Sequence, residues 1–125
     1  MVSGHAPPNW RVVVVKMLKV QEIAQQTAVA GLLAVKGGAK GFGDLADQFR
    51  RALVSVTLNI AEGRTRNGRD EQHFFKIARG SAQEASAALA LLVALGAVPP
   101  DSAAAVEHGL DQVRAMLWRL AQLSR

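Results

Sequence analysis

Basic side chains gather in the segment from residue 50 to residue 79. This segment holds seven of the fifteen Lys and Arg residues of the chain. They are Arg50, Arg51, Arg64, Arg66, Arg69, Lys76 and Arg79. The planar guanidinium group of arginine donates two parallel hydrogen bonds and so matches the geometry of a phosphate group. The segment therefore predicts a surface that binds the backbone of RNA or DNA.

Aromatic side chains do not interleave with these basic residues. Phe74 and Phe75 fall on the apolar stripes that a helix would turn toward a core. Recognition of single strands relies on exposed rings on which bases stack, so it is not supported by this pattern. The pattern instead favours binding directed by the charge and shape of the nucleic-acid backbone.

Four polar residues in the same region have spacings that place them in pairs on helix faces. Asn59 and Glu62 are one helical turn apart, and so are Ser81 and Glu84. Polar groups inside an apolar helix are unfavourable unless they are hydrogen-bonded. We expect these four residues to form a polar network that sets the register of two antiparallel helices. The alternative is a polar surface that meets a ligand or a partner.

No residue pattern indicates a metal centre or an enzyme active site. One carboxylate-x-x-His pair, Asp70 and His73, is present, whereas di-iron bundles need two such pairs and further carboxylates. Glu107 and Asp111 share a helix face with Arg114, which an exposed group of ion pairs explains without catalysis. No nucleophile elbow is present. We expect a protein that is not an enzyme and that holds no metal and no cofactor.

The composition describes one soluble helical domain, residues 1–125. Half of the residues are apolar, and alanine and leucine dominate, which favours helix over sheet. The absence of cysteine excludes disulfides and thiolate metal sites. The formal net charge of +5 favours a polyanionic partner.

Neither a membrane span nor a signal peptide is evident. The longest apolar run, residues 85–98, is shorter than the roughly 20 residues that a transmembrane helix needs. The first residues carry no apolar core preceded by positive charge. We expect a cytoplasmic protein without a membrane partner.

Apolar residues recur every three or four positions and predict four helices. The expected ranges are about 9–35, 44–63, 70–96 and 100–124, with residues 1–8 as a flexible lead-in. The most regular seam consists of Val106, Leu110, Val113, Leu117 and Leu120. Glycine-rich and proline-containing segments separate the ranges, and the segment 64–69 forms a polar turn around Asn67-Gly68.

Short connections between amphipathic helices predict an all-α fold, an up-down-up-down antiparallel four-helix bundle. The range 70–96 is apolar on two faces, and Met116 and Trp118 flank the seam of the last helix. This surplus of apolar surface predicts contacts between subunits, with a monomer as the alternative.

The central residues resemble a known family. The motifs are Gln48-Phe49-Arg50-Arg51-Ala52, Asn59-Ile60-Ala61-Glu62-Gly63, Phe74-Phe75 and Gly80-Ser81 followed by Glu84. They are similar to the motifs of the four-helix bundle proteins of the 23S rRNA intervening-sequence type. The resemblance covers residues 42–98 and extends to the first and last helices only by pattern.

The resemblance implies a bacterial, cytoplasmic bundle without enzymatic activity that assembles into homo-oligomeric rings, commonly pentamers. A related branch of the family serves diversity-generating retroelements, where the accessory protein binds nucleic acid and a reverse transcriptase. The positions that carry over are Arg50, Arg51, Asn59, Glu62, Gly63, Arg79, Ser81 and Glu84. Arg64, Arg66 and Arg69 rest on charge alone.

Two functional hypotheses follow from these observations. In the first, an oligomeric bundle binds the backbone of RNA or DNA through the basic residues around the 64–69 turn. In the second, a ring scaffolds a protein partner, such as a reverse transcriptase, and uses the same arginines in subunit contacts.

Overall fold

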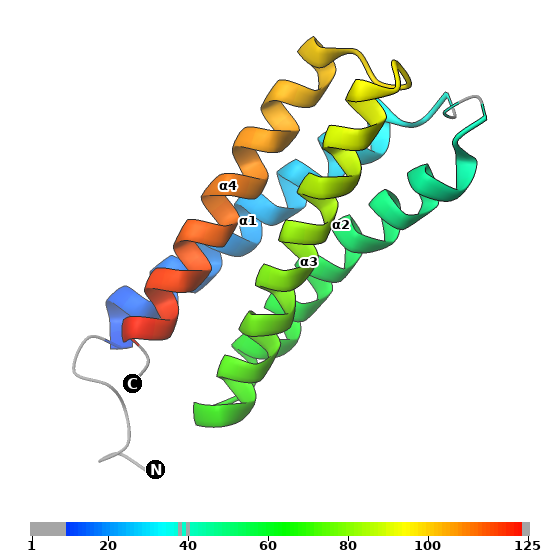
Figure 1. Ribbon diagram of the computed structural model, residues 1–125. Coiled ribbons are helices and arrows are strands. Elements are labelled where there is room, and N and C mark those ends of the chain that lie inside the picture. Colours follow the sequence, from blue (N-terminus) through cyan, green and yellow to red (C-terminus); the bar gives the residue numbers. More distant parts are fainter. Residues whose placement is uncertain (1–9, 38, 40, 124–125) are drawn as a thin grey trace.

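The computed structural model describes residues 10–37, 39 and 41–123 and contains four α-helices (Figure 1). They are α1 (Trp10–Ala34), α2 (Gly43–Arg64), α3 (Gly68–Ala94) and α4 (Pro100–Leu123). No strand occurs among the described residues, so the prediction of an all-α protein with four helices is confirmed. In the same part of the chain, no helix combines the length and apolar character needed to cross a bilayer. The predicted lead-in, residues 1–8, and residues 9 and 124 lie outside the described residues.

The connection between α2 and α3 is shorter than the expected turn over residues 64–69. The backbone N–H groups of Thr65 and Arg66 donate to carbonyls in the last turn of α2, at 3.2 and 3.1 Å. The carbonyl of Asn67 already accepts the first hydrogen bond of α3, and Gly68 supplies the left-handed backbone (φ 55°) at the first helical residue. Only residues 65–67 therefore separate the two helices.

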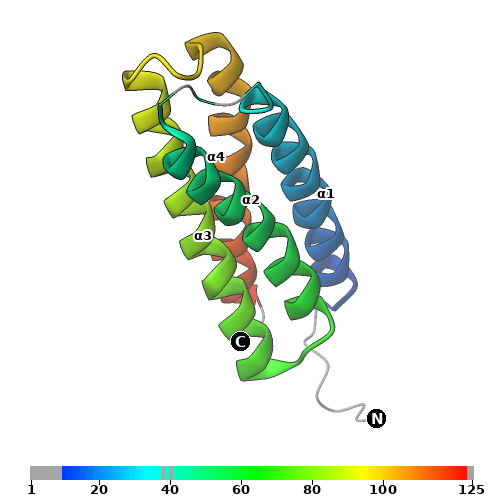
Figure 2. The same cartoon turned by 90° about the vertical axis from the view of Figure 1, so that its right-hand side faces the viewer.

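Each helix packs against two neighbours: α1 against α2 and α4, and α3 against α2 and α4. Figure 1 and Figure 2 show the helices side by side along their length. The α1–α2 and α3–α4 connections lie at one end, and the α2–α3 turn lies at the other. As a result, α3 presents one face to α2 and another face to α4.

The core is almost entirely aliphatic, as the apolar periodicity predicts. The seam of α4 is fully buried, and the inward residues of α1, from Val13 through Thr27, are buried as well. Phe49 and Phe75 are the large aromatic side chains among the fully buried described residues. Buried aliphatic side chains contribute roughly 1.5–3 kcal/mol each relative to exposure, so this core supplies the main stabilisation of the fold.

Gly63 permits a close approach of α2 and α3. A Cβ atom at this position would lie 2.6 Å from Cε1 of Phe75, closer than two carbon atoms can pack. The absence of a side chain at Gly63 therefore lets the buried ring of Phe75 pack directly against the backbone of α2.

Candidate functional site

A hydrogen-bonded chain of polar groups joins α2 and α3 on the N-terminal side of Gly63 in α2. The hydroxyl groups of Ser55 and Ser81 share a hydrogen bond of 2.7 Å, and Ser81 is buried. The side-chain amide of Asn59 donates to the backbone carbonyl of Ser55 at 2.8 Å and to its Oγ at 3.0 Å. We call Ser55, Asn59, Gly63, Phe75 and Ser81 the α2–α3 seam.

The structure divides the four polar residues that the sequence grouped into one network. Asn59 and Ser81 meet through Ser55, one turn before Asn59 on the same helix face. Glu62 is exposed and instead accepts hydrogen bonds from Arg66, at 2.7 and 3.2 Å. Glu84 is exposed and has neither a hydrogen bond nor an ion pair to any described residue. Since Ser55 stands four residues before Asn59, the i, i+4 spacing was the signal that could have placed it in the network.

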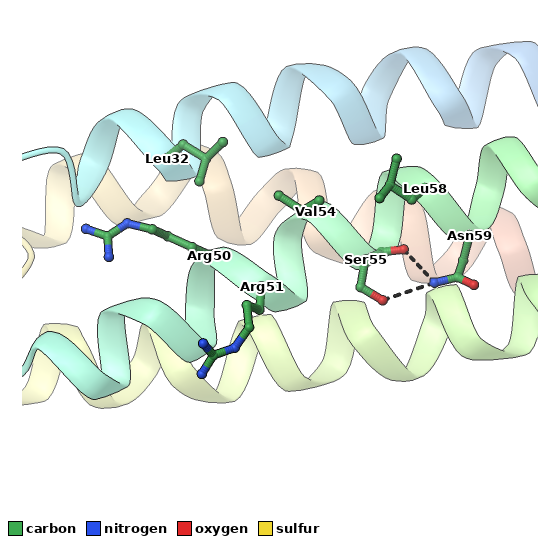
Figure 3. Close-up of a pocket in the computed structure, with 7 residues that line it drawn as sticks. All are labelled: Leu32, Arg50, Arg51, Val54, Ser55, Leu58 and Asn59. Carbon is green, nitrogen blue, oxygen red and sulfur yellow. Dashed lines mark hydrogen bonds between the residues drawn. The ribbon is translucent and has the colours of Figure 1, made fainter.

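Arg50 and Arg51, in the middle of α2, point in different directions (Figure 3). Nη1 of Arg50 pairs with Asp47 at 2.5 Å, and Nη2 donates to the backbone carbonyl of Val35 at 3.0 Å. Arg50 therefore ties the end of α1 to α2. Arg51 is exposed and has no hydrogen bond or ion pair within the described part of the chain.

The arginines at the α2–α3 turn are largely bound within the chain. Arg64 donates to the side-chain oxygen of Gln21 on α1. Arg66 pairs with Glu62 and lies over the ring of Phe74, with Cζ 5.3 Å from the ring centroid. The hydrogen bond and the charge of Glu62 raise the pKa of Arg66 above its usual value. Arg69 is exposed, and no described residue pairs with it.

Lys76 and Arg79 lie on the opposite side of α3, toward α4. They border two adjoining hollows, of about 400 and 420 Å³, that also share Trp118 of α4. Neither cation has a hydrogen bond or ion pair to a described residue. We call this region the α3–α4 groove. It is completed by Gln72, His73, Phe75, Gly80, Gln83, Arg114, Leu117, Ala121 and Gln122.

A second groove, between α1 and α2, is mostly apolar. It has a volume of about 540 Å³ and is lined by Leu32, Val54 and Leu58, with Arg50 and Arg51 at one end (Figure 3). Leu58 is 62% exposed. The sequence located the apolar surplus on α3 and beside the α4 seam. The structure instead exposes many of the large apolar side chains along α1 and α2, because their outward positions are themselves valine and leucine. We call this region the α1–α2 groove.

The charged side chains of α4 that the sequence offered as a possible catalytic or metal site form hydrogen bonds between α3 and α4. Ser86 donates to Glu107 at 2.9 Å and accepts from Nη1 of Arg114 at 2.8 Å, while Nη2 of Arg114 pairs with Asp111. Glu107 and Arg114 thus join the two helices instead of standing alone on an exposed face. Within the described residues, no three His, Asp or Glu side chains cluster as metal ligands would.

These observations define an all-α protein that has an α1–α2 groove and an α3–α4 groove and, in its described part, no metal-ligand cluster. The sequence model of the 23S rRNA-intervening sequence protein family matches residues 18–119. The chain therefore belongs to this family, and the match extends beyond the central motifs into α1 and α4. A search of curated proteins found no match.

Proposed function

We propose that this protein is a non-catalytic, up-down-up-down antiparallel bundle that assembles into a homo-oligomeric ring, with a pentamer favoured, and binds RNA or DNA in the bacterial cytoplasm. The observation that supports nucleic-acid binding is a set of cations without partners among the described residues. Within residues 50–79, these unpaired cations are Arg51, Arg69, Lys76 and Arg79. The intramolecularly bonded arginines, Arg50, Arg64 and Arg66, already have acceptors within the chain.

Unpaired cations favour a polyanionic ligand because binding releases the counterions condensed on its phosphates. An arginine that already pairs with a carboxylate gives up that interaction before it can bind a phosphate, so it adds less to affinity. The four unpaired cations of residues 50–79 alone predict a slope of about −3 to −4 for the logarithm of affinity against the logarithm of salt concentration on a duplex. The net charge of +5 acts in the same direction.

Two triple variants that remove equal charge test this proposal. R69Q/K76Q/R79Q removes three unpaired cations, and R50Q/R64Q/R66Q removes three intramolecularly bonded ones. Fluorescence anisotropy with structured RNA and duplex DNA, at about 50 and about 200 mM salt, measures binding. We expect the first variant to bind more weakly by a larger factor and to lose about three units of the salt slope.

Circular dichroism of both variants controls for unfolding. Unfolding is more of a concern for R50Q/R64Q/R66Q, because that variant removes intramolecular bonds. No binding by the unchanged protein at low salt would contradict the proposal. Equal losses in two folded variants would contradict it as well, since the pairing of the arginines would then not matter.

The second candidate is a ring that scaffolds a protein partner, such as a reverse transcriptase. The observation that favours it is the α1–α2 groove, where Val54 and Leu58 expose apolar surface beside Arg51. Leu58→Glu would place a charge in this groove. If light scattering shows that this change dissociates an oligomer, the groove is a subunit contact. If the oligomer survives and nucleic-acid binding is absent, scaffolding of a protein becomes the better account.

A further inference from the structure

Trp118 is an exposed aromatic residue that stands among cations. Its side chain is 54% exposed and borders both hollows of the α3–α4 groove together with Lys76 and Arg79. The sequence separates Trp118 from the basic segment by more than one helix, so spacing alone did not join them. The packing of α4 on α3 brings the indole and the two cations to one groove.

The ring of Trp118 is open, unlike the other aromatic rings of the described chain that lie beside cations. Arg11 covers Trp10, with Cζ 5.2 Å from the ring centroid, and Arg66 covers Phe74 in the same way. No cation or aromatic ring from residues 10–37, 39 or 41–123 stacks on Trp118. An uncovered indole offers a flat face that any nucleobase can stack on.

The groove around this ring lacks negative charge. Among the residues that line it there is no Asp or Glu, while Lys76 and Arg79 are unpaired. A ligand that brings phosphate oxygens would supply acceptors for both of these side chains.

From this arrangement we propose that the α3–α4 groove binds single-stranded nucleic acid, with a base stacked on Trp118 and neighbouring phosphates bound by Lys76 and Arg79. The proposal rests on the proposed nucleic-acid-binding function and narrows it from backbone binding to recognition of an unstacked base. Single strands are required because the faces of bases within a duplex are covered by their neighbours. A hollow of about 400 Å³ is within the size range of small-ligand sites and can accept one nucleotide.

The test uses the emission of Trp118 itself. The chain has two tryptophans, so W10F leaves Trp118 as the single one. W10F is titrated with oligouridylate, oligothymidylate, an abasic deoxyribose-phosphate oligomer of equal length, and polyglutamate. We expect both base-bearing oligomers to quench Trp118 emission and to bind roughly 5- to 150-fold more tightly than the abasic oligomer, as stacking of one base on an aromatic ring implies. Equal binding of the RNA and DNA oligomers indicates that base and phosphate, and not the ribose hydroxyl, are recognised.

Two variants in the W10F background separate the contribution of the Trp118 ring to affinity from that of the neighbouring cations, which both variants retain. Their binding is measured by anisotropy. W118L keeps an apolar side chain but has no stacking face, so its affinity for oligouridylate should fall to that for the abasic oligomer. W118F keeps a ring and should lose only part of the difference. Because Trp118 is more than half exposed, both variants should fold, and thermal melting checks this.

Each remaining outcome overturns a defined claim. Equal binding of base-bearing and abasic oligomers, or binding without quenching, overturns base stacking and leaves backbone binding intact. Equal quenching by polyglutamate assigns the groove to acidic protein segments and also overturns the proposal. Binding to no oligomer and no duplex removes the nucleic-acid function together with it.

Discussion

The two faces of α3 use polar side chains in opposite ways. Toward α2, the hydroxyl of Ser81 is buried and bonded to Ser55, which in turn accepts from Asn59. Toward α4, Lys76 and Arg79 are unpaired within the described chain and stand beside the open ring of Trp118. The α2–α3 seam satisfies its polar groups internally and sets structure. The α3–α4 groove leaves Lys76 and Arg79 without partners in the described chain, and we propose that a ligand binds them.

This contrast also applies to the arginines at the α2–α3 turn. Arg64 and Arg66 belong to a segment with three arginines in six residues, 64–69, yet both are bonded to side chains of the same chain. Lys76 and Arg79 in the α3–α4 groove, by contrast, have no partner in the described chain. Arginine density along the sequence therefore does not tell which cations are left unpaired in the folded chain.

Two glycine substitutions should separate the faces most strongly. Gly63→Ala places a Cβ 2.6 Å from the ring of Phe75, so we expect the free energy of unfolding to fall by about 1–3 kcal/mol. Gly80→Ala adds a Cβ beside the groove that meets no atom within 4 Å, so it should gain about 0.5–1 kcal/mol from helix propensity. Urea denaturation measures both. Similar effects at the two positions would show that the seam is no tighter than the groove.

Removal of one hydroxyl should affect the seam next most strongly. Ser81→Ala takes away the partner of Ser55 in a buried place, and we expect a loss of about 1–2 kcal/mol in unfolding free energy. A double-mutant cycle with Ser55→Ala should show that the two losses are not additive, because both changes remove the same hydrogen bond.

Lys76→Gln is the matched control in the groove. It should change the unfolding free energy by no more than about 0.5 kcal/mol, as expected for an unpaired surface residue. Additive losses at Ser55 and Ser81, or a large loss at Lys76, would contradict the division between a structural face and a ligand-binding face.

The smallest effect is expected from Glu62→Gln, which removes the negative charge that Arg66 pairs with and leaves a neutral acceptor. Arg66 loses the carboxylate that holds it at 2.7 Å and becomes available to phosphates. We expect affinity for nucleic acid at low salt to rise a few-fold and the salt slope to steepen by about one unit. Anisotropy titrations across salt concentrations measure both quantities. Unchanged binding would show that the pairing of Arg66 does not limit its contribution.

The fold could be predicted from the sequence because its signals are local. The 3.6-residue repeat identified the buried seam of α4, and the motif around Asn59 to Gly63 identified the family. The ends of the helices were harder to predict from the sequence. The start of α3 at Gly68 depends on a backbone hydrogen bond from the turn, not on side-chain periodicity.

The arrangement of the candidate site could be predicted only in part. The spacing of Ser55 and Asn59 within one helix could have placed Ser55 in the network, but the bond of Arg64 to Gln21 joins residues 43 positions apart in the sequence. The position of Trp118 beside Lys76 likewise depends on which helices are neighbours. Such contacts are set by tertiary packing and side-chain rotamers, which residue types and spacings do not encode locally.

Lysine footprinting of the unchanged protein tests most directly whether nucleic acid covers the α3–α4 groove. Lysine acetylation is measured by mass spectrometry with and without saturating single-stranded RNA. We predict that RNA lowers the modification of Lys76 several-fold and leaves Lys19 unchanged, because Lys19 lies on α1 and pairs with Glu22 at 3.4 Å. Modification of Lys76 that does not change when RNA is bound would contradict the account.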